Sequence, residues 1–207
     1  MSQAVQTAHH VEATSTGLNH RKLLMWAFLG GECLFFGSLI STYMIYRGRS
    51  VNGPYPDEVL NIPVTSISTF VLLMSSLAMV LALAAIQRGD HQKFRLWLLS
   101  TAALGAIFLG FQAYEFSYFT VHDHLTITKN LFGATFFILT GFHGLHVTVG
   151  VIWLLSLVFT SLKGKLPQSA SLSVEIAGLY WHFVDVVWIA IFTLVYLLPY
   201  PERLTGS

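Results

Sequence analysis

Five long apolar stretches constrain the fold of this chain more than any other feature of its sequence. They cover residues 23–46, 64–86, 94–119, 131–162 and 174–198. Each is longer than the roughly 20 residues that an α-helix needs to cross the hydrocarbon core of a bilayer. Apolar and polar residues do not alternate along these stretches, as they would in the strands of a membrane barrel. The sequence therefore predicts an all-α fold, a bundle of five transmembrane helices.

The composition is that of a membrane protein rather than a soluble one. Hydrophobic residues make up 54% of the 207 residues and charged residues only 10%, against roughly 25% in a typical soluble domain. A soluble fold of this size could not bury so much apolar surface. The formal net charge is +1, and no basic patch suggests nucleic acid. We therefore expect an integral membrane protein that has lipids, and no nucleic acid, among its partners.

The polar ends of the chain suggest a simple domain organisation. Residues 1–22 are predicted to be a polar tail, 23–199 the transmembrane domain, and 200–207 a short C-terminal tail. The first 20 residues lack the apolar core of a cleavable signal peptide, so the first helix is expected to act as its own insertion signal. Several aromatic residues near the ends of the stretches are interpreted as interfacial anchors: Tyr43, Tyr46, Tyr55, Trp97, Tyr118, Tyr196 and Tyr200.

The distribution of lysine and arginine predicts the orientation of the bundle. Cytoplasmic loops of membrane proteins carry an excess of these residues. One side of the predicted bundle collects seven of them, and the other side collects four. The richer side places the N-terminus in the cytoplasm and, with five spans, the C-terminus outside. The seven are Arg21, Lys22, Arg88, Lys93, Arg95, Lys163 and Lys165, and the four are Arg47, Arg49, Lys129 and Arg203.

Several polar and ionisable residues lie inside the apolar stretches. Such groups are costly at membrane depth, so they are expected to face the bundle interior and to have partners there. No phosphate-binding loop, Cys-x-x-Cys pair or nucleophile elbow accompanies them, and we identify no catalytic residue. The candidate site residues are Glu32, Gln112, Glu115, His143, His146, His182 and Asp185.

The histidine spacing leaves three interpretations open. His143 and His146 are three residues apart and share a helix face, as do His182 and Asp185. They could be interhelical hydrogen-bond partners. They could bind a metal together with a buried carboxylate, or two histidines from different helices could ligate a haem. The repeated Glu-x-x-His of membrane di-iron proteins is absent, which weakens the metal interpretation.

The buried carboxylates also allow two interpretations. Glu32 and Glu115 could take part in a proton or ion relay, as intramembrane acids often do. They could instead hydrogen-bond to a residue of a neighbouring helix, with His143, His146 or His182 as candidate partners. The spacing of the residues does not decide between a relay and a purely structural role.

Four motifs carry a resemblance to a known family. They are MWAFLGGECLFF, FQAYEF, TGFHGLHVTVG and YWHFVDVVWIAIF, one on each of four predicted helices. In this order they resemble subunit III of the haem–copper terminal oxidases, the cytochrome c oxidase subunit 3 family, and the resemblance extends over residues 23–198. Many members of that family have seven helices. This chain resembles the short, five-helix form, and the missing pair would precede the helix that bears Glu32.

The resemblance implies an accessory role without redox chemistry. Subunit III of this family holds no haem, copper or other metal. It packs beside the large subunit (subunit I), which holds the haem–copper site that reduces oxygen, and it supports assembly, sustained turnover, and proton and oxygen access. We therefore expect a subunit of a proton-pumping cytochrome c oxidase in the bacterial plasma membrane, in contact with the other oxidase subunits and with bound phospholipid.

The resemblance also turns the seven candidate residues into an expected buried polar network, either structural or related to protons. Trp181, Trp188 and Gly144 are expected to pack around it. The alternatives are subunit III of a quinol oxidase and a membrane anchor that holds haem between two histidines. A small proton-coupled carrier and a related protein of nitric oxide reduction systems remain further alternatives.

Overall fold

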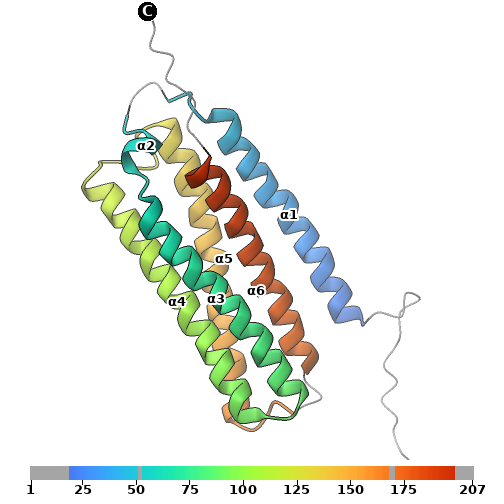
Figure 1. Cartoon of the computed structure of the whole chain (residues 1–207). Helices are drawn as coiled ribbons and strands as arrows, with labels where there is room; N and C mark the ends of the chain where they lie inside the picture. Colours follow the sequence, from blue (N-terminus) through green and yellow to red (C-terminus); the bar gives the residue numbers. More distant parts are fainter. Residues whose placement is uncertain (1–18, 51–52, 168–170, 199–207) are drawn as a thin grey trace, which may run out of the picture.

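The described residues of this computed structural model, 19–50, 53–167 and 171–198, form a bundle of long helices and no β-strand (Figure 1). All five predicted apolar stretches are helices long and apolar enough to cross a membrane, which confirms the predicted fold class. The ends of the five spans lie within three residues of the predicted ones when the last span is counted to Leu197. The long helices are α1 (His20–Tyr46), α3 (Ile62–Gln87), α4 (His91–Val121), α5 (Leu131–Leu162) and α6 (Ser171–Ile191).

Two elements were not predicted. A short helix, α2 (Pro56–Val59), lies in the loop between α1 and α3. The last helix does not continue as an α-helix, because α6 ends at Ile191 and the chain goes on as a π-helix, η2 (Phe192–Leu197). Of the predicted tails, residues 1–18 and 200–207 lie outside the described residues, and residues 20–22 belong to α1.

Asn or Asp side chains begin four of the five long helices. Each side chain accepts a hydrogen bond from a backbone N–H of the first turn, which would otherwise have no partner. The four N-cap residues are Asn19, Asn61, Asp90 and Asn130. At Asp90, the bond from the backbone of Lys93 and the nearby Lys93 ammonium lower the pKa of the carboxyl group below its ordinary value.

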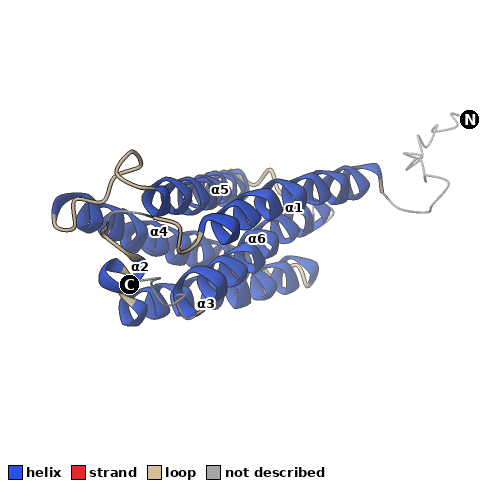
Figure 2. Ribbon diagram, turned by 90° about the horizontal axis from the view of Figure 1, so that it is seen from above, coloured by secondary structure: helices blue, strands red, loops and turns tan. Residues whose placement is uncertain are grey.

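The helices pack as a body of four with α1 on its flank (Figures 1 and 2). α3 packs chiefly against α4 and α6, and α5 packs against α4 and α6. α1 lies against α5 and α6. It buries only Leu29, Phe36 and Tyr43, which are seven residues apart and therefore form one narrow stripe. The interior of the protein thus lies between the other four long helices.

Glycine allows the closest approach inside this body. The Trp181 side chain is completely buried and lies against α4 and α5. A Cβ atom on Gly105 would lie 2.5 Å from Trp181 Cη2, and one on Gly150 would lie 2.8 Å from Trp181 Cζ3. The indole Nε1 donates to Ser75 Oγ on α3 at 2.9 Å. Trp181 therefore joins α6 to the other three helices of the body.

The two ends of the bundle differ in their charged groups. We call the end that carries α2, the α4–α5 loop and the end of η2 the α2 end. The seven cations grouped by the sequence lie at the opposite end, where α1 begins, and where Lys22 Nζ lies 2.5 Å from Glu175 Oε1 of α6. At the α2 end, the Arg47 guanidinium donates to the carbonyl of Leu198. The orientation of these ends in a membrane stays a prediction.

Two tyrosines contradict the interpretation as interfacial anchors. Tyr43 and Tyr196 are only 1% and 5% exposed, so they belong to the protein interior. Tyr46 and Tyr118, by contrast, are more than 40% exposed. Tyr43 belongs to the seven-residue stripe of α1, and Tyr196 of η2 donates from its hydroxyl to the buried Glu115. Tyr200 lies outside the described residues.

Candidate functional site

The seven candidate residues lie in small groups at different helix interfaces. The first group joins α1 to α5. Glu32 Oε2 lies 3.3 Å from His146 Nε2, and both side chains are largely shielded. His146 Nδ1 lies 2.8 Å from the carbonyl oxygen of Phe142. Because a carbonyl only accepts, Nδ1 must carry a hydrogen. The other nitrogen, Nε2, is therefore the one that faces the Glu32 carboxyl group.

The second group joins α3, α4 and η2 around Glu115, which is 8% exposed. Its Oε1 accepts from Thr65 Oγ1 at 2.9 Å, and its Oε2 accepts from the Tyr196 hydroxyl at 3.1 Å. Glu115 therefore bonds to two hydroxyl groups rather than to one of the candidate histidines. Both partners were missed by the sequence analysis, because a Thr near a helix start and a Tyr near a helix end have many ordinary roles.

The third group joins α4 to α5 through Gln112. Its side-chain amide Nε2 donates to the backbone carbonyl of Thr140 at 2.6 Å. A Cβ atom on Gly144 would lie 2.6 Å from Gln112 Oε1. Glycine at this position therefore gives the amide the space it occupies. Gly144 therefore lies directly beside the candidate residue Gln112.

The fourth group surrounds His143, which has no exposed surface. Its ring stacks on Trp188 with the centroids 4.9 Å apart, and the edge of Phe108 closes another side at 5.8 Å. Neither ring nitrogen has a hydrogen-bond partner among the described residues. Trp188 in turn donates from Nε1 to Thr69 Oγ1 on α3 at 2.9 Å. His143 is thus held by aromatic packing at the junction of three helices.

The fifth group lies between α3 and α6. His182 Nδ1 lies 2.6 Å from Ser76 Oγ. One turn later on α6, Asp185 is only 3% exposed, and neither carboxyl oxygen has a partner in hydrogen-bonding geometry within the described residues. His182 also lines an apolar cleft of about 340 Å³ between α1 and α6, together with Trp26 and Phe183.

The histidines do not converge on a common centre. His146 Nδ1 is bonded to Phe142 and its Nε2 lies near Glu32, His182 is bonded to Ser76, and His143 is enclosed by aromatic rings. Over the part of the chain that the structure describes, no group of three or more His, Cys, Asp or Glu side chains could hold a metal ion. The candidate side chains thus lie at several helix interfaces rather than around one centre.

The comparisons with known proteins agree with these features. A family model described as cytochrome c oxidase subunit III matches residues 1–200. The cytochrome c oxidase subunit 3 of Bacillus sp. strain PS3 is 41% identical over 186 residues, which cover 90% of this chain and 89% of the relative. That of Synechocystis sp. is 43% identical over 175 residues, with 83% and 72% covered. The quinol oxidase subunit 3 of Bacillus subtilis is 38% identical over 173 residues, with 84% of each covered.

Five membrane-spanning helices, polar groups that join them in pairs, and this similarity along nearly the whole chain lead to one assignment. The chain is an integral membrane protein that belongs to the cytochrome c oxidase subunit III family, the non-catalytic third subunits of multi-subunit terminal oxidases.

Proposed function

We propose that this chain is subunit III of a haem–copper oxidase that takes electrons from cytochrome c, reduces oxygen to water and pumps protons across a bacterial plasma membrane. The haem and copper would be held by the large subunit (subunit I). The chain itself would support assembly, sustained turnover, and proton and oxygen access. The observation that carries this proposal is that five of the seven candidate side chains contact a polar group of another helix.

The proposed role of the seven residues is to fix how the helices pack and to hold protons locally. A polar group that crosses a helix interface in a membrane specifies which helices meet, because no water is available as an alternative partner. Glu32 with His146 joins α1 to the body, and Gln112 joins α4 to α5.

We further propose that phospholipid binds beside α1. Cavities flank this helix on both sides, one of about 330 Å³ and one of about 340 Å³. Both are lined mainly by apolar and aromatic residues, and each includes one histidine, His146 or His182. Acyl chains would fill such apolar space at membrane depth. The excess of lysine and arginine at the end opposite α2 supports placing that end in the cytoplasm.

The second candidate is subunit III of a quinol oxidase. The 38% identity to the Bacillus subtilis quinol oxidase subunit 3 favours it. The identity to the cytochrome c oxidase subunit of Bacillus sp. strain PS3 is 41%. Cytochrome c is therefore the first donor to test, and quinol the second.

The experiment is a mild-detergent purification of the tagged chain from native membranes, followed by mass spectrometry and two oxygen-consumption assays. We expect the large haem–copper subunit in equal amount, and oxygen consumption with reduced cytochrome c. Oxygen consumption with quinol alone would select the second candidate. Recovery of the chain without a haem–copper subunit would refute both. A Soret band from the isolated chain would revive the haem anchor.

A further inference from the structure

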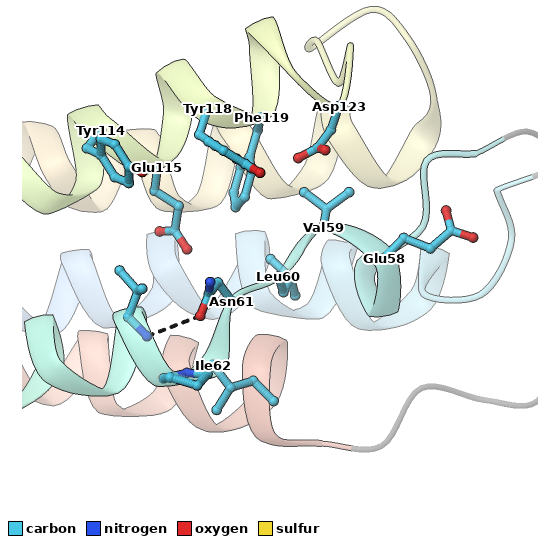
Figure 3. A pocket seen from close by; sticks show the side chains of 12 residues that line it. Glu58, Val59, Leu60, Asn61, Ile62, Tyr114, Glu115, Tyr118, Phe119 and Asp123 are labelled. Atoms are coloured by element: carbon cyan, nitrogen blue, oxygen red, sulfur yellow. Dashed lines mark hydrogen bonds between the residues drawn. The ribbon is translucent and has the colours of Figure 1, made fainter.

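A cavity lies at the α2 end of the bundle. Of the seven candidate residues, only Glu115 lines it. It has a volume of about 510 Å³ and lies between the segment from α2 into α3 and the last turns of α4 (Figure 3). Its wall includes Leu60 and Ile62 on one side and Tyr118 and Phe119 on the other. Glu115 lies about six residues, or roughly 9 Å, from the end of α4. We call this space the α2-end pocket.

Two carboxyl groups point into the α2-end pocket. Figure 3 shows the Glu115 and Asp123 side chains directed into the space between α4 and the start of α3. Glu115 is only 8% exposed, and its two carboxyl oxygens accept from neutral hydroxyl groups. Asp123 Oδ2 is shielded from solvent and has no hydrogen-bond partner among the described residues. A third acid, Glu58, turns away and accepts from the backbone of Tyr55 at 3.0 Å.

An apolar groove continues from the α2-end pocket along the membrane-facing side of α3 and α4. Its volume is about 490 Å³, and it is lined by Val64, Ile107, Gly110, Phe111 and Tyr114. Val64 and Tyr114 line both spaces, so the two are contiguous. Gly110 has nothing within 4 Å of where a Cβ atom would lie, so its backbone lies open to a neighbour. The site therefore has an acidic head at the α2 end and an apolar body towards the middle of the membrane.

The lining of this site restricts its occupant. None of the residues lining the pocket is Lys, Arg or His, so nothing there would neutralise a lipid phosphate beside two carboxylates. The described residues also offer no set of three metal ligands. What fits is a single positive charge on an aliphatic stem, attached to an apolar surface. A Lys or Arg side chain near the end of a transmembrane helix has this form, because its stem packs along apolar surface while its head reaches polar surroundings.

We propose that the α2-end pocket and its groove dock a transmembrane helix of a partner oxidase subunit, whose Lys or Arg inserts between Asp123 and Glu115. This inference rests on the proposed function, because it requires that the chain assemble with other membrane subunits. In this proposal the partner helix packs along the membrane-facing side of α3 and α4, and its positive charge contacts the two acids at the α2 end. Charge complementarity of this kind fixes the register of two surfaces more than it adds affinity.

The first test is photo-crosslinking in the intact complex. Tyr118 is 44% exposed and lines the pocket, so it is replaced by the photoreactive p-benzoylphenylalanine. The matched control carries the same residue at Ile138, which is 38% exposed on α5. We expect Tyr118→p-benzoylphenylalanine to crosslink a transmembrane segment of a partner subunit that has a Lys or Arg at the corresponding end. Crosslinks to lipid alone, or to a segment without such a residue, would overturn the inference.

The second test removes the charge. In the purified complex, Asp123→Asn should speed dissociation of the chain by about tenfold, as expected when one member of a shielded ion pair is lost. Asp90→Asn is the control, because it removes one carboxylate at the opposite end and keeps a competent N-cap residue. Equal dissociation of the two variants would count against the pocket.

A charge reversal keeps the result independent of folding. Asp123→Lys should weaken the complex. Replacing the Lys or Arg of the crosslinked partner segment by Glu should then restore it. Failure of this rescue would contradict direct pairing. If the unmodified chain does not purify with a haem–copper subunit, the proposed function fails. If the unmodified chain purifies with a haem–copper subunit but the Tyr118 and Asp123 variants behave like their controls, the docking site fails and the proposed function stands.

Discussion

α1 and the four-helix body of α3, α4, α5 and α6 use different means to hold their places. Half of the most apolar window of the last span, Ser171–Leu197, is buried within the protein, against 11% of the window in α1. Between nine and 14 residues of each body helix are buried, and only three in α1. In a bilayer, apolar side chains gain little by leaving lipid for protein. Close packing therefore holds the body, and a few polar contacts matter more for α1.

The contacts of α1 are spread along its length. Lys22 pairs with Glu175 at one end, Glu32 contacts His146 further along, and the Arg47 guanidinium reaches a backbone carbonyl at the other end. The apolar stripe between these points presents one side chain in every seven residues. Much of the remaining surface of α1 is open to lipid or to a partner. Substitutions should therefore have unequal effects in the two regions.

The largest effect is expected from filling the closest contact of the body. With Gly105→Leu, the new side chain would collide with Trp181 Cη2 and with Val151 Cγ2, which lie 2.5 Å and 3.0 Å from an added Cβ. Overpacking of this kind costs about 3 kcal/mol. The matched variant on α1 is Gly37→Leu, where nothing lies within 4 Å. Thermal unfolding of the purified complex should show a lower midpoint for Gly105→Leu only. Similar midpoints for the two variants would remove the contrast between the regions.

A smaller loss is expected where the body relies on a buried hydrogen bond. Tyr196→Phe removes one of the two hydroxyl donors to Glu115 and leaves a buried oxygen without a partner, which costs about 2 kcal/mol. Tyr46→Phe on α1 removes a hydroxyl from a side chain that is 41% exposed and should change little. Thermal unfolding measures both. If Tyr196→Phe is as stable as the unmodified protein, the hydrogen bond from η2 to Glu115 contributes nothing to the stability of the body.

Breaking the polar contact of α1 should have a still smaller effect on stability. Glu32→Ala leaves His146 Nε2 without its partner and is expected to cost about 1 kcal/mol. The oxidase should keep its haem spectrum but lose activity earlier during sustained turnover, because α1 detaches more readily. Glu32→Gln should behave better, because its amide can still donate to the imidazole. A lost haem spectrum in Glu32→Ala would contradict a role confined to this subunit.

The sequence predicted the two regions unequally well. Length and apolarity sufficed to place all five spans, because a helix in lipid must satisfy its own backbone hydrogen bonds. The same patterns did not separate α1 from the body, since the apolarity of α1 falls within the range of the body helices. The four cap residues mark helix starts that the apolar stretches placed up to three residues late. The change from α6 to η2 has no equivalent signal, because a π-helix depends on local packing rather than on a residue pattern.

For the polar groups, the sequence predicted the candidate residues but not their hydrogen-bond partners. An acid, a histidine or a side-chain amide within an apolar stretch stands out, so all seven candidates could be named in advance. Their partners Thr65, Ser76 and Tyr196 could not, because Ser and Thr within a helix usually bond to their own backbone. Ser66, which bonds to the carbonyl of Ile62, is such a case. Sequence spacing gives the face of a helix, but the facing helix decides which hydroxyl is reached.

The smallest effect is expected at the turn between α3 and α4, where the body ends in water. Asp90 is partly exposed, and its carboxylate accepts from the backbone N–H of Lys93 at 3.0 Å, which lowers its pKa below the ordinary value of 3.8. A group with a lowered pKa contributes stability that is present above its ordinary value and is lost as the pH falls through the folded-state value. Asp90→Asn keeps the cap, because the amide oxygen also accepts, and should abolish this acid-dependent part. Asp90→Ala should lower the unfolding midpoint even at neutral pH. If both variants follow the unmodified pH profile, the cap contributes nothing, and the stability of the body resides entirely in its interior contacts.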